Sequence, residues 1–516
     1  MDMMVSRIEL GALRKAPKAV AETVVVGKDI FELFAGAMYA EPLSIFREYV
    51  QNAADALDEA RTQGLSRAGP NDVEIWFDHS ERSVRIRDTG VGVPGAQFIK
   101  RLTSIGASRK RGTSARGFRG IGRLSGLGYC QELVFRSRAA GDAKVKEMVW
   151  NGKALRDRLR SADYDGSLSD LVKEVATVGD IPGAGYPLHF FEVEMRKLLR
   201  VKNDVLLNEQ AVRSYLSQVA PVPFSPEFRL GPKIQAWLFE RTQSQPVSVI
   251  LHDGQGPIYH RAVNSFPVSP KVFDEFRDVT FLEYVDSDGD VLAFGWTLDH
   301  SYAGAISRKL GLGGIRLRKG DVQIGDDQLL SFVFPEARFA QWVVGDVHVA
   351  HARIVPNGRR DDFEHSPALA QLHEHLRDLG RALTGSIRER SDQRAKLKKV
   401  QLALQYAENW RVQSVEAPSP ALSAAAAERA DHFSEQARKA LSKLSDAVAA
   451  KHHANELAAR LESELDKWRK KNVRRFAAVN PMQRAALTAV LSSSVKASEV
   501  MPLALDVGRA MAKASR

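Results

Sequence analysis

The chain of 516 residues has one cysteine, Cys130, so it can form no intramolecular disulfide and supplies no thiol-ligated metal site. We interpret Cys130 as a small apolar residue. No run of about 18 apolar residues occurs without a charge, and residues 1–10 lack a basic stretch followed by an apolar segment. We therefore expect a cytoplasmic protein with no membrane partner. The absence of a GxxxxGK[ST] segment excludes the P-loop class of nucleotide-binding proteins.

The composition is that of an ordinary soluble globular protein, with 44% hydrophobic and 27% charged residues. The length predicts about three domains. The net charge of +11 is concentrated in residues 366–516, which hold roughly 26 Lys and Arg against roughly 16 Asp and Glu. Such a basic region can meet nucleic acid, an anionic membrane or an acidic protein, and charge alone does not choose among them.

The pattern of residues predicts an α+β protein in three parts. Residues 1–208 mix helical and alternating patterns with glycine-rich turns, which is typical of an α/β layer structure. A connecting helix is expected from residue 207 to the prolines Pro221 and Pro223. Short alternating runs, such as residues 233–239 and 315–318, predict a second α+β domain over residues 209–365. Residues 366–516 are nearly free of glycine and should be helical.

Within the helical region, the first helix is expected from about Pro367 to Arg411, with a break at residues 417–420. A second helix carries an apolar stripe at a spacing of three and four residues. This stripe favours packing inside a helical bundle, with a dimer interface as the alternative. The stripe consists of Leu441, Leu444, Val448, Leu457, Leu461, Leu465 and Trp468.

Residues 45–57 predict an amphipathic helix that carries polar side chains on one face. Glu48, Asn52 and Asp55 share that face at positions i, i+4 and i+7, opposite an apolar stripe. Alone, this pattern is that of any helix with a solvated face. The segments that follow give it a specific interpretation.

Residues 73–77 and 83–88 predict two paired strands. The period of two places Val84, Ile86 and Asp88 on one face, so a carboxylate points to the side of the core and needs a hydrogen-bond donor. Gly90 and Gly92 follow directly, and their missing side chains permit another group to approach the backbone. The donor can be the amino group of an adenine, or Asp88 can simply cap the glycine turn.

Residues 117–125 have the form of a glycine loop that opens a helix. Backbone N–H groups at a helix N-terminus attract phosphate, and glycines let the phosphate come close. The preceding segment, residues 100–116, is rich in Gly, Ser, Lys and Arg. It is expected to be a lid over bound nucleotide or a basic surface loop.

In this order the three segments resemble the N, G1 and G2 boxes of the ATPase superfamily that joins gyrase, the heat-shock chaperones, histidine kinases and MutL. The resemblance covers about the first 200 residues and implies a Bergerat-type α/β sandwich that binds ATP and Mg²⁺. It rests on Glu-x-x-x-Asn-x-x-Asp at residues 48–55, Asp-x-Gly-x-Gly at residues 88–92 and Gly-x-x-Gly-x-Gly at residues 117–122.

The resemblance implies a role for each of these residues. Glu48 matches the general base that activates water, and Asn52 matches the ligand of the phosphate-bound magnesium. Asp55 matches the residue that borders the nucleoside, and Asp88, with Gly90 and Gly92 beside it, matches the acceptor of the adenine amino group. The phosphate loop corresponds to Gly117, Gly120, Ile121 and Gly122.

Two further segments refine the resemblance. The family usually has a threonine on a late strand of this domain, whereas residues 188–195 here contain none. Residues 354–364 are similar to the middle-domain loop by which the ninety-kilodalton heat-shock chaperones deliver an arginine to the γ-phosphate. Arg360 matches that arginine, with Arg359 as the alternative, and a guanidinium can bind two phosphate oxygens at once. Surface ion pairs with Asp361 and Asp362 are the simpler interpretation of both arginines.

The sequence therefore predicts a magnesium-dependent ATPase that resembles the heat-shock chaperones most closely. It is expected to couple ATP binding to a conformational change on a protein client or partner, as a homodimer. The alternative is an ATP-operated nucleic-acid clamp in the manner of MutL or the type II topoisomerases. For the basic region 366–516 we expect only weak, non-specific nucleic-acid binding, because its basic clusters alternate with acidic residues.

Overall fold

The computed structural model describes residues 41–65, 71–104, 122–161, 163–164, 166–444 and 450–514. The chain divides into two compact units. The first consists of Met1–Ala262, Leu317–Asp326 and His348–Ser366, and the second of Val263–Arg316, Asp327–Val347 and Pro367–Arg516. The three domains predicted from the sequence, with boundaries at residues 208 and 365, stay a prediction.

The first unit is built on a sheet of seven strands in the order β5-β4-β3-β6-β2-β1-β7. Neighbouring strands are antiparallel except for β1 and β7, which are parallel. The strands are β1 (Val73–Asp78), β2 (Ser83–Asp88), β3 (Cys130–Arg138), β4 (Val145–Asn151), β5 (Ala176–Ile181), β6 (Phe190–Leu198) and β7 (Val249–Leu251). The helices are α2 (Ser44–Thr62), α3 (Gly95–Thr103), α4 (Gly152–Arg160), α5 (Leu168–Val175), α6 (Glu209–Val219) and α7 (Gly231–Thr242), with the 3₁₀ helices η1 (Gly122–Gly128) and η2 (Val205–Leu207).

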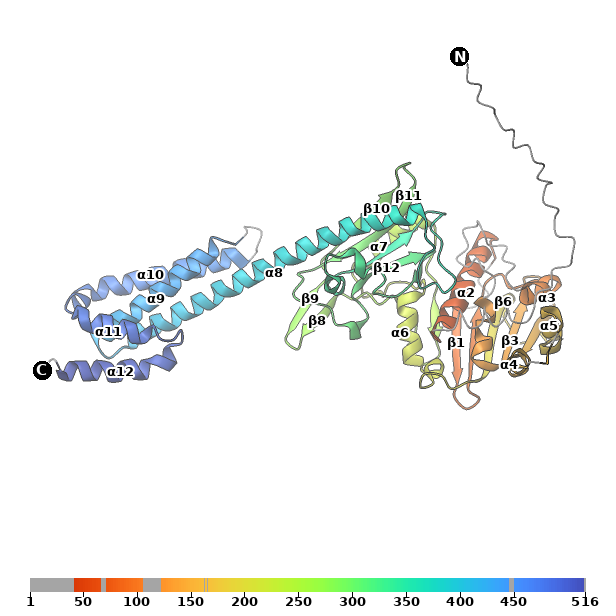
Figure 1. The fold of residues 1–516 in the computed structure, drawn as a ribbon, viewed down its shortest axis with the longest axis horizontal. Coiled ribbons are helices and arrows are strands. Elements are labelled where there is room, and N and C mark those ends of the chain that lie inside the picture. The colour runs from red at the N-terminus through yellow and green to blue at the C-terminus, as the bar shows by residue number, and fades with distance from the viewer. Residues whose placement is uncertain are drawn as a thin grey trace, which may run out of the picture. The chain divides into compact units, whose positions relative to one another are not determined.

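One face of this sheet forms the core with α2 and its neighbours (Figure 1). The apolar stripe predicted for residues 45–57 is confirmed, since Ile45, Phe46 and Val50 of α2 are fully buried against the strands. The predicted strand pair is also confirmed, with Val73 opposite Asp88 at the end of the ladder. Cys130 lies in the same core, and burial raises the pKa of its thiol to about 12. It therefore behaves as the small apolar residue that the sequence predicted.

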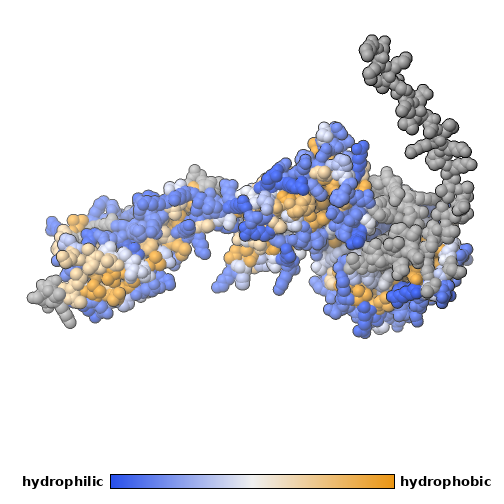
Figure 2. Space-filling view, viewed as in Figure 1, coloured by the Kyte–Doolittle hydropathy of each residue, from blue (hydrophilic) through white to orange (hydrophobic). Residues whose placement is uncertain are grey.

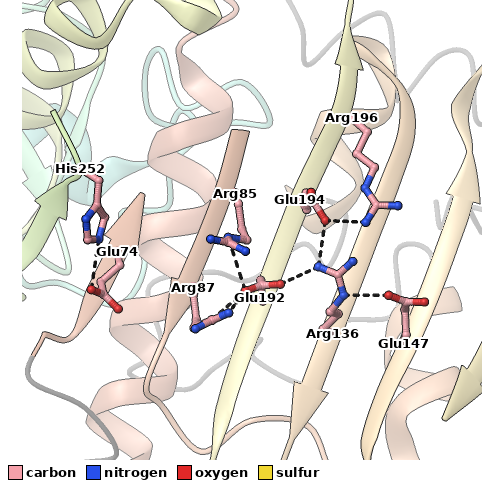
Figure 3. A network of polar contacts seen from close by, with 9 residues as sticks. All are labelled: Glu74, Arg85, Arg87, Arg136, Glu147, Glu192, Glu194, Arg196 and His252. Carbon is pink, nitrogen blue, oxygen red and sulfur yellow. Dashed lines mark hydrogen bonds and ion pairs between the residues drawn. The ribbon is translucent and has the colours of Figure 1, made fainter. Parts of the chain in front are cut away.

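The opposite face of the sheet carries a network of charged side chains (Figure 3). Because side chains alternate along a strand, Glu192 and Glu194 of β6 point away from the core, whereas Val193 and Met195 point into it. The side chain of Glu192 is only 1% exposed and lies 2.6 Å from Arg87 and 2.7 Å from Arg136. Arg136 also binds Glu147 and Glu194, so the network crosses strands β2, β6, β3 and β4.

Glu192→Ala is expected to destabilise the first unit by about 3–5 kcal/mol, because it leaves the guanidinium of Arg87, whose side chain is 16% exposed, without the carboxylate that it binds, and removes one of the three carboxylates that bind Arg136. The matched control is Glu147→Ala, whose side chain is 26% exposed and whose loss leaves Arg136 with two carboxylates. The control should lower the free energy of unfolding by about 1 kcal/mol or less. Urea unfolding followed by circular dichroism measures both. Equal effects of the two substitutions would show that the buried ion pairs of Glu192 do not stabilise the sheet more than the more exposed pair of Glu147.

The second sheet has five strands in the order β10-β11-β14-β12-β13, and β8 and β9 form a separate hairpin. The strands are β8 (Ser265–Ser269), β9 (Val272–Glu275), β10 (Asp278–Val285), β11 (Val291–Asp299), β12 (Gly314–Lys319), β13 (Val322–Ile324) and β14 (Val344–Val349). Short 3₁₀ helices connect them: η3 (Arg308–Leu310), η4 (Ser331–Val333) and η5 (Ala337–Trp342).

The C-terminal region is helical, as predicted. Its helices are α8 (Pro367–Glu416), α9 (Pro420–Leu441), α10 (Ala450–Ala477), α11 (Pro481–Leu491) and α12 (Ala497–Ala514). Helices α8, α9, α11 and α12 share one apolar core around Trp410 and Phe433. Figure 2 shows apolar patches among hydrophilic residues on these helices, and Met482 and Leu503 are 76% and 55% exposed. None of the helices in the described ranges has the length and apolar character that spanning a bilayer requires.

Two details of the predicted elements are wrong. Residues 233–239, expected as a strand, belong to helix α7, where Ile234 and Leu238 are buried at a spacing of four residues behind Pro232 in the first turn. The single second helix expected in the C-terminal region is divided, because α9 ends at Leu441 and α10 begins at Ala450. The side chains of Leu457, Leu461, Leu465 and Trp468 lie outside the described part of the structure, so their stripe stays a prediction.

Candidate functional site

Helix α2 presents Glu48 to a loop that comes from far along the chain. A carboxylate oxygen of Glu48, Oε1, lies 3.1 Å from Nη1 of Arg360, and each side chain is 12% exposed. Both residues belong to the first compact unit, because residues 348–366 are part of it. Arg359 is exposed. Of the two arginines that the sequence offered, Arg360 is therefore the one whose side chain meets Glu48.

The backbone of the arginine loop has an unusual conformation at Arg360. Its φ angle is 57°, in the left-handed region that L-residues other than glycine seldom adopt. The N–H of Arg360 donates to the carbonyl of Asn357 at 3.2 Å, and its own carbonyl accepts from the N–H of Gly325 at 2.9 Å. These bonds compensate for the strain and hold the loop in one shape.

Several charged groups surround Arg360. Burial lowers the pKa of its guanidinium, Glu48 and Asp55 raise it, and Arg47 lowers it. The Nη1 atom is buried and makes no hydrogen bond of good geometry within the described structure, although it lies at ion-pair distance from Glu48. A buried guanidinium with an incompletely satisfied N–H group is suited to receive an anion.

The last glycine of the predicted phosphate loop lies against Glu48. A Cβ atom on Gly122 would come within 2.1 Å of Glu48 Oε2, so no side chain fits at this position without displacing the carboxylate. Gly122 opens the 3₁₀ helix η1, at the place where the sequence predicted that a helix begins. Gly117, Gly120 and Ile121 lie outside the described residues, as does most of the predicted lid.

Asp88 ends strand β2 with its side chain on the core side, as the alternation predicted. It is 5% exposed, and its Oδ1 accepts from the N–H of Gly90 at 2.9 Å. Burial raises the pKa of Asp88 to about 7, partly offset by hydrogen bonds from the backbone of Gly90 and Phe191. The carboxylate thus caps the glycine turn. A carboxylate has about four acceptor sites, so two backbone bonds leave capacity for an additional donor.

The glycines after Asp88 are required by the protein's own packing. A Cβ on Gly90 would lie 2.6 Å from Cβ of Ala56, and one on Gly92 would lie 2.2 Å from the carbonyl oxygen of Arg138. Gly92 also has a φ angle of 68°. The sequence explained these glycines by the approach of a bound group, whereas the groups that approach in the structure are α2 and β3.

The position of the missing threonine is filled by apolar residues. Phe191 pairs with Asp88 across β2 and β6, and Val193 and Met195 follow on the core face. Next to them, Nδ1 of His189 lies 2.7 Å from the carbonyl oxygen of Gly90 and donates to it. A hydrogen-bond network around a bound adenine would therefore use residues other than the threonine that the family usually has on this strand.

The raised pKa of Asp88 predicts a change of stability with pH. A carboxyl whose folded-state pKa is raised stabilises the fold fully below its unfolded pKa of about 4, and that contribution is lost as the pH rises to about 7. The unfolding midpoint of wild type should therefore fall relative to Asp88→Asn between about pH 4 and pH 7 and run parallel to it above. A difference that stays constant over this range would contradict the buried, protonated carboxyl. Thermal unfolding across this pH range measures it.

Three residues of the site were not predicted from the sequence. Arg47 is 8% exposed, and its Nη2 donates to the carbonyl of Arg359 at 3.2 Å. Gln51, on the same side of α2 as Glu48, is 2% exposed, and its Oε1 accepts no hydrogen bond from the described residues. Tyr215 of α6 is electrostatically coupled to Arg47, Glu48 and Arg360, and burial raises its pKa. No local pattern in the sequence marks these three residues, because their burial results from contacts that only the fold creates.

Comparison with known proteins agrees with this geometry. Residues 42–176 match the family of histidine kinase-, DNA gyrase B- and HSP90-like ATPases. Over these residues the chain is similar to that family. The match includes α2 with Glu48, Asn52 and Asp55, strand β2 with Asp88, and the glycine loop up to Gly122.

The curated proteins similar to this chain include the chaperone protein HtpG from three bacteria. The HtpG of Photorhabdus laumondii is 25% identical over 209 residues, which cover 37% of this chain and 30% of that chaperone. The HtpG of Coxiella burnetii is 29% identical over 141 residues, covering 24% and 22%. That of Serratia proteamaculans is 26% identical over 165 residues, covering 28% and 25%. The chain thus spans less than a third of the length of these relatives.

Proposed function

We propose that the chain is a magnesium-dependent ATPase that acts, like a heat-shock chaperone, on a protein partner. The observation that carries the proposal is the meeting of Glu48, Arg360 and Gly122: a carboxylate, a buried guanidinium and the end of a glycine loop within about one side-chain length. Phosphoryl transfer needs little beyond positioning and charge stabilisation, and these three groups supply both.

Each residue has a role in this proposal. Glu48 is the general base that takes a proton from the attacking water. Arg360 stabilises the charge that develops on the γ-phosphate, and the backbone at Gly122 receives the phosphates. Asp88 accepts a hydrogen bond from the adenine amino group, and Asp55 borders the nucleoside. This assignment implies that Arg360 leaves its ion pair with Glu48 and forms one with the γ-phosphate when ATP is bound.

The donor set also fits a magnesium ion. Asn52 lies one helical turn after Glu48 on α2, half-buried, and a single side-chain amide oxygen suffices when phosphates and waters complete the coordination. A bound magnesium ion would neutralise phosphate charge. The test is phosphate release by the full chain with Mg²⁺ and with EDTA. Turnover that persists in EDTA would contradict the metal assignment, and absence of turnover with Mg²⁺ would contradict the ATPase.

The partner in this proposal is a protein, and the chain acts as a homodimer. Support comes from the similarity to HtpG chaperones over stretches of 141 to 209 residues. A Glu48→Gln chain loaded with ATP is a suitable bait, because slow turnover prolongs the bound state. The ATPase rate should respond to the captured protein and not to DNA. Strong stimulation by DNA that is lost on deleting residues 366–516 would instead indicate a nucleic-acid clamp.

A further inference from the structure

Arg47 connects helix α2 to the loop that carries Arg360. It directly precedes Glu48 and is 8% exposed, and its Nη2 donates to the carbonyl oxygen of Arg359 at 3.2 Å. The two residues are 312 positions apart in the chain. The bond therefore fixes the backbone of the loop one residue before Arg360, on the same helix that bears Glu48.

The other bonds of the loop shape it without attaching it to α2. The turn is closed by the N–H of Arg360 on the carbonyl of Asn357 and by Nδ2 of Asn357 on Asp361 at 2.6 Å. Gly325, which follows β13, holds the carbonyl of Arg360. Two contacts in the described structure connect the loop to α2: the Arg47 bond at the backbone and the Glu48–Arg360 ion pair at the side chains.

The charge of Arg47 argues against a role in binding Arg360 itself. Two guanidinium groups close together repel each other, and Arg47 is near enough to Arg360 to lower the pKa of its guanidinium. Such an arrangement is unfavourable for stability alone. The arrangement is explained if the planar guanidinium of Arg47 is needed to reach the backbone carbonyl of Arg359. The side chain of Arg360 then stays available to the phosphate.

We propose that Arg47 is a positioning residue that seats the loop of residues 357–362 on α2, so that Arg360 stays within reach of the phosphate site. This inference rests on the proposed ATPase function. Arg47 acts through Arg360 and does not itself contact the nucleotide.

A double-mutant cycle tests this inference in the full chain. Arg47→Ala should lower kcat by about 10- to 100-fold with little change in KM, the scale of a misplaced catalytic group. In an Arg360→Ala background the same substitution should add less than about twofold, because the two residues act as a unit. Arg47→Lys should recover part of kcat. Additive effects, or a loss of nucleotide affinity in Arg47→Ala, would overturn the inference and make Arg47 a ligand of its own.

Hydrogen exchange measured by mass spectrometry tests it independently of turnover. Arg47→Ala should speed exchange in peptides that contain residues 355–364 and Gly325, and leave strands β1 and β2 unchanged. Arg196→Ala, on the charged face of the sheet, is the matched control and should change neither. Unchanged exchange in the loop of both Arg47→Ala and Arg47→Lys would overturn the seating role. A wild-type chain without ATPase activity would refute the proposed function, while this measurement would still decide about Arg47.

Discussion

Glu48→Gln is expected to lower ATP turnover by roughly two to four decades while ATP affinity stays near that of wild type. Glutamine keeps the shape of the side chain, and its amide oxygen can still accept from Arg360, which lies 3.1 Å from Glu48. It cannot take a proton from water. Glu48→Ala should show the same loss of turnover, with added instability because Arg360 would be buried without its counter-ion.

The control for this substitution is Glu59→Gln, which lies on the same helix but is exposed, and whose side chain accepts a hydrogen bond from Gln63, four residues later, at 3.2 Å. It should leave kcat and KM unchanged. Initial rates of phosphate release and calorimetric titration with a non-hydrolysable ATP analogue give the two quantities. If binding and turnover fall together in Glu48→Gln, Glu48 is a structural residue and another group must activate the water.

Arg360→Ala is expected to slow hydrolysis by about 10³-fold, the effect of losing an arginine finger. The guanidinium lies beside Glu48, and its buried Nη1 makes no hydrogen bond of good geometry with the described residues, so its contribution should appear when the phosphate carries its greatest charge. ATP affinity should change much less than kcat. Single-turnover measurements separate the chemical step from binding and product release.

Arg359→Ala is the matched control for this prediction. Arg359 is exposed, and the contact that it makes with Arg47 uses its backbone carbonyl, which alanine retains. The rate of ATP hydrolysis by Arg359→Ala should stay within about twofold of wild type, because surface substitutions away from special features have small effects. A large loss in Arg359→Ala with little loss in Arg360→Ala would exchange the roles of the two arginines.

Local periodicity was sufficient to predict the elements that carry the nucleotide motifs. The apolar stripe of residues 45–57 fixed which face of α2 is buried, and therefore that Glu48, Asn52 and Asp55 share the other one. Alternation in residues 83–88 placed Asp88 on the core side at the end of β2. Both patterns depend on neighbouring residues alone, which is why one sequence revealed them.

Contacts between distant segments were beyond the reach of such patterns. The bond from Arg47 to Arg359 and the pairing of β7 with β1 join residues far apart in the chain, and no local pattern shows that these partners meet. The strand predicted from alternating hydrophobicity in residues 233–239 was wrong. These residues form part of helix α7, where Ile234 and Leu238 are buried on one side. The glycines at positions 90 and 92 were recognised, but the backbone atoms that crowd them belong to α2 and β3.

The charged face of the sheet illustrates the same limit. In the sequence, Glu192, Glu194 and Arg136 are ordinary polar residues of alternating strands. Only the strand order β4-β3-β6-β2 brings them together, with Glu192 almost completely buried among arginines. Strand order is a property of the fold and has no signature in the spacing of these residues.

Transfer of the label from γ-³²P-ATP tests the central claim most directly, because it separates hydrolysis from phosphorylation of the protein. The full chain with Mg²⁺ should release the label as inorganic phosphate, leave no label on the protein, and lose this activity in Glu48→Gln while still binding ATP. Label retained on the protein, or phosphate release that is unchanged in Glu48→Gln, would contradict an ATPase that uses Glu48 as its base.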